Sequence, residues 1–415
     1  SGTVIIGESR EGVIIDCTTN NVQISSSGDT AFYATGTITL TNDSAVVTGS
    51  GTSWSGNVAV GEYFMITGND GIFPFEISSV DNNTQITLTD PYRGRPQAVG
   101  IGYAIVALNK NIYIGSLTIR RNTNKPLIFT FCRNISIVNC EIDGNNLAGD
   151  IITLDRSYNC LIKELWVHDA SSTGNGILLT TSSQSSGNHK VVDSIISGCS
   201  NGIRIDASTS YNRIVNSQCE YNDVDGVSIG GGFNQVYGCN AQYNNDNGIK
   251  ITGGTRHIIN GCRVQYNQGD GVEIASGAGF ITINANICSY NRNNGINMAG
   301  AGNSAGLNTI SNNVCTDSSG GTAGQLNGIY INGTDRMIVI GNVCQNNAES
   351  GIEVGGNSDR NILTANVCHQ NDEGIRIDGA TELNNVVTSN IIFDNTTNEF
   401  VDNGTTTSTN NNITT

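Results

Sequence analysis

The sequence is poor in proline, methionine, tryptophan and charge. Of its 415 residues only 4 are Pro, 3 are Met and 2 are Trp, and charged residues make up 13%, whereas 51 residues are Gly. A chain of this length ordinarily folds into two or three globular domains. The low proline content, the many glycines and the very frequent Asn instead favour one long body that turns at regular intervals.

Positive charge and long apolar runs are scarce as well. Acids outnumber bases by 36 to 20, and the formal net charge of −16 disfavours a nucleic-acid partner. No apolar run approaches the roughly 18–20 residues that cross a bilayer. The opening SGTVIIGESREG lacks the basic start and apolar middle of a signal peptide. We therefore expect a soluble, mature or trimmed chain with neither nucleic acid nor a membrane as partner.

A repeat dominates the remaining sequence. Copies such as NGIRI, DGVSI, NGIKI and EGIRI place a Gly before an apolar-x-apolar triplet, and these glycines lie 22 to 33 residues apart. They are Gly176, Gly202, Gly226, Gly248, Gly271, Gly295, Gly328, Gly351 and Gly374. Short period-two strands at this spacing, with no helical periodicity between them, predict a β-solenoid. The framework of leucine-rich repeats is absent.

The residue before each Gly is mostly Asn or Asp. These types best tolerate a left-handed backbone conformation, and Gly then permits a sharp corner into the next strand. We therefore interpret NG and DG as coil corners that tolerate such a conformation, and not as two-residue hairpins, because the flanking strands continue around the coil and stack in parallel.

Upstream of each corner, three files of residues recur in register. One passes from Cys239 and Cys262 into an Asn ladder at Asn286, Asn342 and Asn366. A second contains small apolar residues, among them four more cysteines; the third is Tyr221, Tyr243, Tyr266 and Tyr290. None of the 12 cysteines forms a CxxC pair, which removes the usual support for zinc or redox sites. We expect buried thiols, with a few axial disulfides left open. The tyrosines either stabilise a corner by stacking or bind sugar.

The coil pattern resembles the right-handed parallel β-helix of pectate-lyase-like proteins, a group that includes polysaccharide lyases, glycoside hydrolases, mannuronan epimerases and phage tailspikes. The resemblance implies an all-β solenoid of about twelve coils. We expect first coils at 1–35, an insertion at 36–100, the main β-helix at 101–400 and a polar tail at 401–415.

The insertion does not follow the sequence repeat of the coils. Its five or six short alternating strands predict a small antiparallel barrel, and the run AVVTGSGTSW…VGEYFMI…FEISSVDNNTQITLTDPY resembles a module of phage tail and fibre proteins. The aromatic residues there are Trp54, Tyr63, Phe64, Phe73, Phe75 and Tyr92, which we expect mostly in the barrel core.

Two sets of residues are candidates for chemistry. The early coils bring together Asp143, Asp155, His168 and Asp169 as catalytic candidates, because neighbouring carboxylates can divide acid and base roles. The corner alignment places Asp143 near His168 and Asp169, and Asp155 with Arg156 near Asp206. The competing interpretation is that corner Asp residues only cap backbone N–H groups.

The second set is the outward middle residue of each triplet. Arg204, Lys250 and Glu273 of this file, with Arg156 and Asp206, are the predicted substrate-binding residues; the alternative is a solvated face of cross-strand pairs. We expect no metal site and no cofactor, with calcium left open by the Asp-rich corners although no loop has EF-hand spacing. The Asp-Pro-His signature of mannuronan epimerases is absent.

These patterns predict an extracellular or virion-associated protein that binds a polysaccharide and cleaves it as a tailspike-type depolymerase, by hydrolysis or elimination. The alternative is a non-catalytic viral fibre or adhesion shaft. The resemblance to tailspikes, together with uncovered strand edges at the solenoid end, implies a homotrimer.

Overall fold

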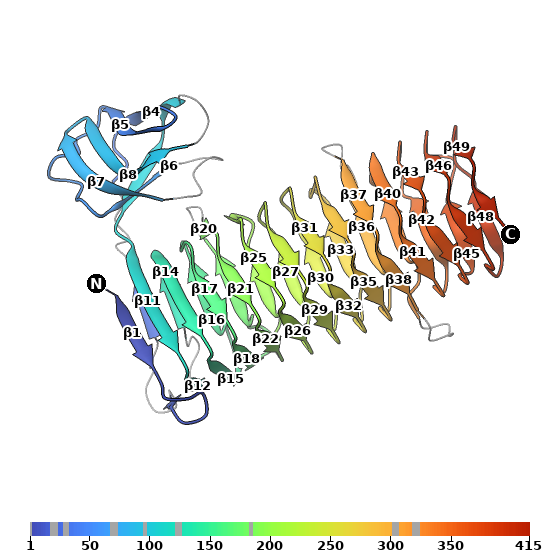
Figure 1. Cartoon of the computed structure of the whole chain (residues 1–415), viewed down its shortest axis with the longest axis horizontal. Coiled ribbons are helices and arrows are strands. Elements are labelled where there is room, and N and C mark those ends of the chain that lie inside the picture. The colour runs from blue at the N-terminus through green and yellow to red at the C-terminus, as the bar shows by residue number, and fades with distance from the viewer. Residues whose placement is uncertain are drawn as a thin grey trace.

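A long solenoid with a small antiparallel module at its N-terminal end makes up the structure (Figure 1). The computed structural model describes residues 2–16, 24–27, 33–66, 74–93, 98–120, 127–181, 186–300, 307–317 and 324–415. Within these ranges the regular elements are all β-strands. No helix in these ranges is long and apolar enough to cross a membrane.

Three parallel sheets run the length of the solenoid. Sheet A contains, in order along the axis, β1 (Thr3–Ile6), β11 (Asn109–Gly115), β14 (Cys132–Val138), β17 (Leu161–Lys163), β21 (Lys190–Val192), β25 (Arg213–Val215), β28 (Gln235–Tyr237), β31 (Ile258–Asn260), β34 (Thr282–Asn284), β37 (Asn308–Ser311), β40 (Met337–Ile340), β43 (Ile362–Thr364), β46 (Val386–Thr388) and β49 (Ser408–Asn410). Sheet B contains β2 (Ile14–Asp16), β12 (Thr118–Arg120), β15 (Glu141–Leu147), β18 (Trp166–Ala170), β22 (Ile195–Ser197), β26 (Gln218–Glu220), β29 (Asn240–Gln242), β32 (Arg263–Gln265), β35 (Ile287–Ser289), β38 (Val314–Thr316), β41 (Val343–Gln345), β44 (Val367–His369), β47 (Ile391–Phe393) and β50 (Ile413–Thr414). Sheet C contains β3 (Ile24–Ser27), β13 (Leu127–Thr130), β16 (Ile152–Asp155), β19 (Ile177–Thr180), β23 (Ile203–Ile205), β27 (Val227–Ile229), β30 (Ile249–Ile251), β33 (Val272–Ala275), β36 (Ile296–Ala299), β39 (Ile329–Asn332), β42 (Ser350–Gly355), β45 (Glu373–Ile377) and β48 (Asn398–Asp402). Two further short strands, β20 (Ser186–Gly187) and β24 (Thr209–Ser210), belong to successive coils and pair with each other in parallel. The predicted solenoid of about twelve coils is confirmed, and residues 401–415 continue the stack with β49 and β50.

Alternation along each strand separates the core from the surface. Each strand pairs in register with the equivalent strand of the next coil, so that Ile203, Val227 and Ile249 stack inward while Arg204 and Lys250 point outward. The inward side chains form one continuous apolar cluster that reaches from Ile114 to Ile392. The outward file predicted from the triplets is therefore confirmed.

The corners differ from the expectation. The Asn and Asp residues before the glycines, such as Asn201 and Asp225, do not have positive φ angles, so their predicted left-handed conformation is wrong. The left-handed residues of this corner lie one residue before the inward-facing Asn, as at Tyr221 (φ 55°). Gly202 is needed for space instead, because a Cβ there would lie 2.6 Å from the carbonyl oxygen of Gly226.

Side-chain amides form axial ladders inside the coil. In the first ladder each Nδ2 donates to the Oδ1 of the following coil at 2.9–3.0 Å, through Asn286, Asn313, Asn342, Asn366, Asn390 and Asn412. This is the ladder expected from sequence, and it is confirmed. A second ladder contains Asn222, Asn244, Asn267, Asn291, Gln325, Asn347, Asn371 and Asn395. The third contains the residues before the glycines, namely Asn175, Asn201, Asp225, Asn247, Asp270, Asn294 and Asn327.

The other two predicted files are present as well. The eleven described cysteines are buried thiols and form no disulfide with one another; Cys17 lies outside the described residues. The rings of Tyr221, Tyr243, Tyr266 and Tyr290 stack in order with centroids 5.0, 5.0 and 4.8 Å apart. The tyrosine file therefore stacks at a corner.

The inserted module is an antiparallel barrel-like sheet. Its strand order is β10 (Tyr103–Val106), β6 (Tyr63–Ile66), β7 (Phe75–Asn82), β8 (Gln85–Tyr92), β5 (Ser44–Ser50), β4 (Thr37–Leu40) and β9 (Ala98–Ile101). Trp54, Phe64 and Tyr92 are buried in its core and Phe75 packs against them, as expected; Phe73 lies outside the described residues. Tyr63 instead joins a second apolar cluster that includes Tyr158 of the solenoid, which attaches the module to the first coils.

Candidate functional site

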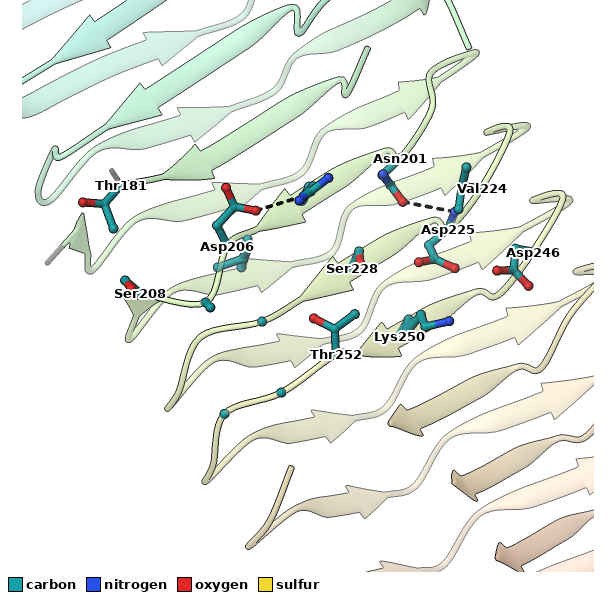
Figure 2. A pocket seen from close by; sticks show the side chains of 16 residues that line it. Thr181, Asn201, Asp206, Ser208, Val224, Asp225, Ser228, Asp246, Lys250 and Thr252 are labelled. Carbon is teal, nitrogen blue, oxygen red and sulfur yellow. Dashed lines mark hydrogen bonds and ion pairs between the residues drawn. The ribbon is translucent and has the colours of Figure 1, made fainter. Parts of the chain in front are cut away.

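A groove of about 850 Å³ crosses the outer face of sheet C over β23, β27 and β30 (Figure 2). Its lining includes Asn201, Arg204, Asp206, Ser208, Asp225, Ser228, Asp246, Lys250 and Thr252. Figure 2 shows Asp225 and Asp246 on one side of the groove and Asp206 and Ser208 on the other. The corners before the strands supply the first pair, and the turns after the strands supply the second.

Asp225 is the most perturbed carboxyl of the groove. Only 3% of its surface is exposed, and burial raises the pKa of this carboxyl above its ordinary value. The neighbouring charge of Asp246 acts in the same direction, whereas the hydrogen bonds from Asn247 and the charge of Lys250 oppose it. The Nδ2 and backbone N of Asn247 donate to Oδ1 of Asp225 at 3.1 and 3.2 Å. Burial therefore favours the protonated form of Asp225 more than it would be favoured in an exposed carboxyl.

Asp206 lies in the opposite environment. Its Oδ1 accepts a hydrogen bond from Nε of Arg204 at 2.9 Å, and its Oδ2 accepts one from Oγ1 of Thr180 at 2.6 Å. Two donors, one of them a guanidinium, therefore contact this carboxyl group. The groove thus contains carboxyl groups in unlike surroundings, which is the condition for dividing acid and base roles.

Lys250 lies on the groove floor and is paired. Its Nζ lies 2.7 Å from Oε2 of Glu273, which also accepts a hydrogen bond from Nδ2 of Asn247 at 3.0 Å. Three of the predicted substrate-binding residues, Arg204, Asp206 and Lys250, therefore line the groove, and Glu273 contacts it through Lys250.

The predicted catalytic residues divide between two sheets. Asp143 and His168 are cross-coil partners in sheet B. Nδ1 of His168 lies 2.9 Å from Oδ2 of Asp169, and its Nε2 lies 3.3 Å from Oε1 of Glu141. The Trp166 ring stacks on the imidazole at 4.2 Å. The sequence alignment of Asp143 with His168 and Asp169 thus corresponds to real proximity, on a face other than that of the groove.

Asp155 is separate from that group. It ends β16 of sheet C and pairs with the adjacent Arg156, whose Nη2 lies 2.6 Å from its Oδ2. Arg156 also lies over the Phe131 ring at 4.3 Å. Asp155 is in register with Thr180, whose hydroxyl contacts Asp206, so this pair lies nearer to the groove than to His168.

One cluster offers several potential metal ligands. Among the described residues, Asp143, His168 and Asp169 bring three ligand atoms within 4.8 Å of one another. Calcium takes six to eight oxygen ligands, whereas this cluster includes an imidazole. The Asp143 carboxylate also already faces Nε of Arg120 at 3.2 Å. The cluster suits calcium poorly.

Sequence reasoning did not select Asp225 and Asp246. Asp225 was interpreted only as a corner residue, together with the Asn residues that occupy the same position in other coils. The available signal was the carboxylate itself: Asp225 and Asp270 are the two acids in an otherwise amide ladder, and burial raises the pKa of both.

Comparison with known proteins agrees with this fold. The family model described as "Right handed beta helix region" matches residues 97–219 and 175–324, which together cover more than half of the chain. The chain therefore belongs to the right-handed β-helix family. A search of curated protein sequences found no match.

Solved structures resemble the chain at low sequence identity. The tailspike gp61 of Pseudomonas phage phi297 has a TM-score of 0.54 at 11% identity, over 96% of this chain and 67% of that one. The A-module of the mannuronan C-5 epimerase AlgE6 of Azotobacter vinelandii has a TM-score of 0.49 at 13% identity, over 74% and 84% of the two chains. The periplasmic alginate epimerase AlgG has a TM-score of 0.47 at 14% identity, over 73% and 76%.

Proposed function

We propose that the groove of sheet C binds a polysaccharide outside the cell or on a virion, and that its carboxyl groups hydrolyse a glycosidic bond. The observation that supports this most is the buried Asp225, with its raised pKa, on the wall of an open groove that holds further carboxylates. The groove crosses several coils and is lined by hydroxyl, amide and charged groups. Such a surface suits an elongated, hydroxyl-rich ligand, and tailspikes are among the proteins that share the fold.

In this mechanism Asp225 is the general acid. Its carboxyl protonates the leaving oxygen, while Asp246, on the same side of the groove, acts as base or nucleophile. Asp206 and Arg204 bind substrate on the opposite side. Hydrolysis is favoured over elimination because elimination needs a cation to neutralise the substrate carboxylate, and Arg204 and Lys250 each already pair with an acid.

The test is Asp225→Asn, with Asp270→Asn as its matched control. Both acids lie in the third ladder, are buried and have raised pKa values, but Asp270 does not line the groove. We expect Asp225→Asn to lower the rate of depolymerisation about 10²–10⁴-fold and Asp270→Asn to leave it nearly unchanged. The assay is release of reducing ends from a panel of capsular and plant polysaccharides. Normal cleavage by Asp225→Asn contradicts the proposed acid.

The Asp143, His168 and Asp169 group remains an alternative catalytic set. Under the groove proposal, Asp143→Asn and Asp169→Asn cleave normally. If both lose activity while melting at the wild-type temperature, the active site lies on sheet B.

A non-catalytic fibre or adhesion shaft is the second candidate function. It is favoured by the equal placement of Asp225 and Asp270 in the third ladder, since Asp270 has the same bonds from Asn294 without lining the groove. In that case the wild-type protein binds polysaccharide or a surface and cleaves nothing on the panel.

A further inference from the structure

We propose that the outer face of sheet B holds a divalent metal ion of the zinc type, with Asp143, His168 and Asp169 as its ligands. The site joins two neighbouring coils, because Asp143 of β15 is the register partner of His168 in β18. This inference goes beyond the proposed function, since the groove lies on sheet C and its proposed mechanism uses no metal.

The three ligand atoms already lie close together. Asp143, His168 and Asp169 each offer one ligand atom, and these atoms lie within 4.8 Å of one another. Nδ1 of His168 and Oδ2 of Asp169 are 2.9 Å apart. Two ligands of a tetrahedral zinc ion, each about 2.0–2.2 Å from the metal, lie about 3.4 Å from each other. A small outward rotation of the Asp169 side chain, which is 54% exposed, therefore makes room for the ion.

The surroundings of the imidazole point to a positive charge between these two atoms. His168 is only 9% exposed, and its Nε2 faces a further carboxylate, Oε1 of Glu141, at 3.3 Å. A neutral imidazole has one N–H group, so it can donate to only one of the two carboxylates. When Nε2 donates to Glu141, the lone pair of Nδ1 faces the Asp169 oxygen. A metal ion or a second proton removes this repulsion, and the experiment below distinguishes the two.

Glu141 and Trp166 hold the imidazole in the orientation that a metal ion requires. A metal-binding His usually donates its other ring N–H to a carboxylate, which fixes the ring and makes the ligating nitrogen more basic. Glu141 occupies that place, and Oγ1 of Thr118 contacts its second oxygen at 3.4 Å. The Trp166 ring stacks on the imidazole with centroids 4.2 Å apart. The ring is therefore positioned before any metal binds.

The charges of the cluster match a divalent cation. Glu141, Asp143 and Asp169 supply three carboxylates, and Arg120, whose Nε lies 3.2 Å from Oδ2 of Asp143, supplies one positive charge. The strands β15, β18 and β22 contain no Lys or Arg. With a neutral His168 the cluster thus has a surplus of two negative charges, which one divalent ion balances.

The existing bonds of Asp143 do not prevent it from binding the ion. Its Oδ2 accepts from Nε of Arg120, and its Oδ1 accepts from the backbone N of Asn145 at 2.8 Å. Each carboxylate oxygen has two lone pairs, so one remains on each oxygen.

The ligand types favour zinc over calcium. An imidazole nitrogen suits zinc, copper, iron and nickel, whereas calcium takes six to eight oxygen ligands. Zinc binds both imidazole and carboxylate groups. Three protein ligands leave one position of a tetrahedral ion open, and we expect an exchangeable water molecule there.

The test measures zinc binding to the full chain after treatment with EDTA, by isothermal titration calorimetry and by metal analysis of the desalted protein. We expect one zinc ion per chain, and a melting temperature that rises with zinc and not with calcium or magnesium. His168→Asn should abolish this binding. His369→Asn is the matched control, because His369 has the same outward position in β44 and its ring stacks on Phe393 at 4.8 Å. Among the described residues no carboxylate pairs with the His369 ring, so this variant should bind zinc as the wild-type protein does.

Two further variants sharpen the result. Glu141→Gln keeps an acceptor for Nε2 but removes the charge, and it should lower the zinc affinity about 10–100-fold. Asp169→Asn should also abolish binding, and it does not endanger the fold because this side chain is more than half exposed. Circular dichroism verifies the β-sheet content of each variant.

Each other outcome contradicts the proposal. A wild-type chain that binds no zinc has a second proton on His168 instead of a metal ion. Zinc that binds equally well to the wild-type protein, His168→Asn and Asp169→Asn lies elsewhere in the chain. Calcium binding that is tighter than zinc binding overturns the type of metal. These measurements need no polysaccharide, so their result is independent of whether the groove cleaves one.

Discussion

The groove segment, residues 199–254, and the C-terminal segment, residues 307–317 and 324–395, have nearly the same interior and very different exteriors. In both, inward aliphatic residues pack beside axial amide ladders. Outside, all three sheets of the groove segment carry charge, as at Arg213 of sheet A, Glu220 of sheet B and Lys250 of sheet C. In the C-terminal segment the charged strand residues are confined to sheet C, and the strands of sheets A and B carry none. The interior therefore specifies the coil, and the exterior is free to specify what each segment binds.

The ladders show how closely the interiors correspond. Asn244 and Asn371 occupy equivalent positions in the second ladder. The Nδ2 of each donates to a carbonyl oxygen at 3.1 Å, and each Oδ1 accepts from the backbone N and the Nδ2 of the preceding Asn. The two segments thus provide a matched pair of sites.

The largest expected effect tests this equivalence. Asn244→Ala and Asn371→Ala should each lower the free energy of unfolding by about 3 kcal/mol, because each leaves buried N–H groups without an acceptor. Chemical denaturation measures both. If the losses in free energy of unfolding of the two variants differ by more than about 2 kcal/mol, the two interiors are not equivalent.

The next prediction concerns a buried titratable residue beside the groove segment, at a position that an Asn occupies in the C-terminal segment. His257 lies just after the groove segment, its Nδ1 accepts from the backbone N of Asn234 and its Nε2 lies 3.1 Å from the carbonyl oxygen of Gly253. Burial lowers the pKa of His257 to about 4. The unfolded chain then binds more protons than the folded one below pH 6.5, so stability falls as the pH drops from about 6.5 to 4.

His257→Asn should remove this loss. The variant should gain about 2 kcal/mol over the wild-type protein at pH 5 relative to pH 8, as measured by denaturation at both pH values. Asn361→His is the reciprocal change, because Asn361 accepts from the backbone N of Met337 in the C-terminal segment. It should introduce acid sensitivity there, and an unchanged pH profile in both variants rules out the proposed cause.

The smallest effect is expected at the corners. Tyr243 has a left-handed conformation (φ 57°) and stacks between two tyrosines, whereas Asn346 and Gln370 have the same conformation at equivalent corners of the C-terminal segment. Tyr243→Asn loses stacking but gains a residue that tolerates this conformation. We expect a change below about 1 kcal/mol in thermal or chemical denaturation. A larger loss shows that the groove segment depends on its tyrosine file.

Much of the architecture was predictable because it repeats. The alternation around Arg204 and Lys250 determines which side chains point outward, and equal spacing places Tyr221 over Tyr243. The position of the left-handed residue was predicted wrongly, because residue preference favours Asn and Asp for that conformation. In the structure tyrosines such as Tyr221 have the left-handed backbone, whereas Asn201 and Asp225 are buried hydrogen-bonding residues.

The site was less predictable. Corner alignment correctly placed Asp143 beside His168, but counting along the chain cannot show which of three faces is hollow. Asp225 was overlooked for a related reason, since its pKa depends on burial at a corner that sequence alone could only describe as a turn.

The amide ladders also have a direction. In the first and second ladders the NH₂ groups point toward the following coil, whereas in the third they point toward the preceding one. An amide dipole has its positive end at the N–H group, so each ladder is electrically polar. A carboxylate has no N–H group with which to donate to the next side chain, so a series of aligned amides ends where a carboxylate accepts the last hydrogen bond. The second ladder ends in this way, where Nδ2 of Asn395 donates to Glu399. The Glu399 carboxylate consequently lies at the positive end of eight aligned side-chain dipoles, as an anion does at the N-terminus of an α-helix.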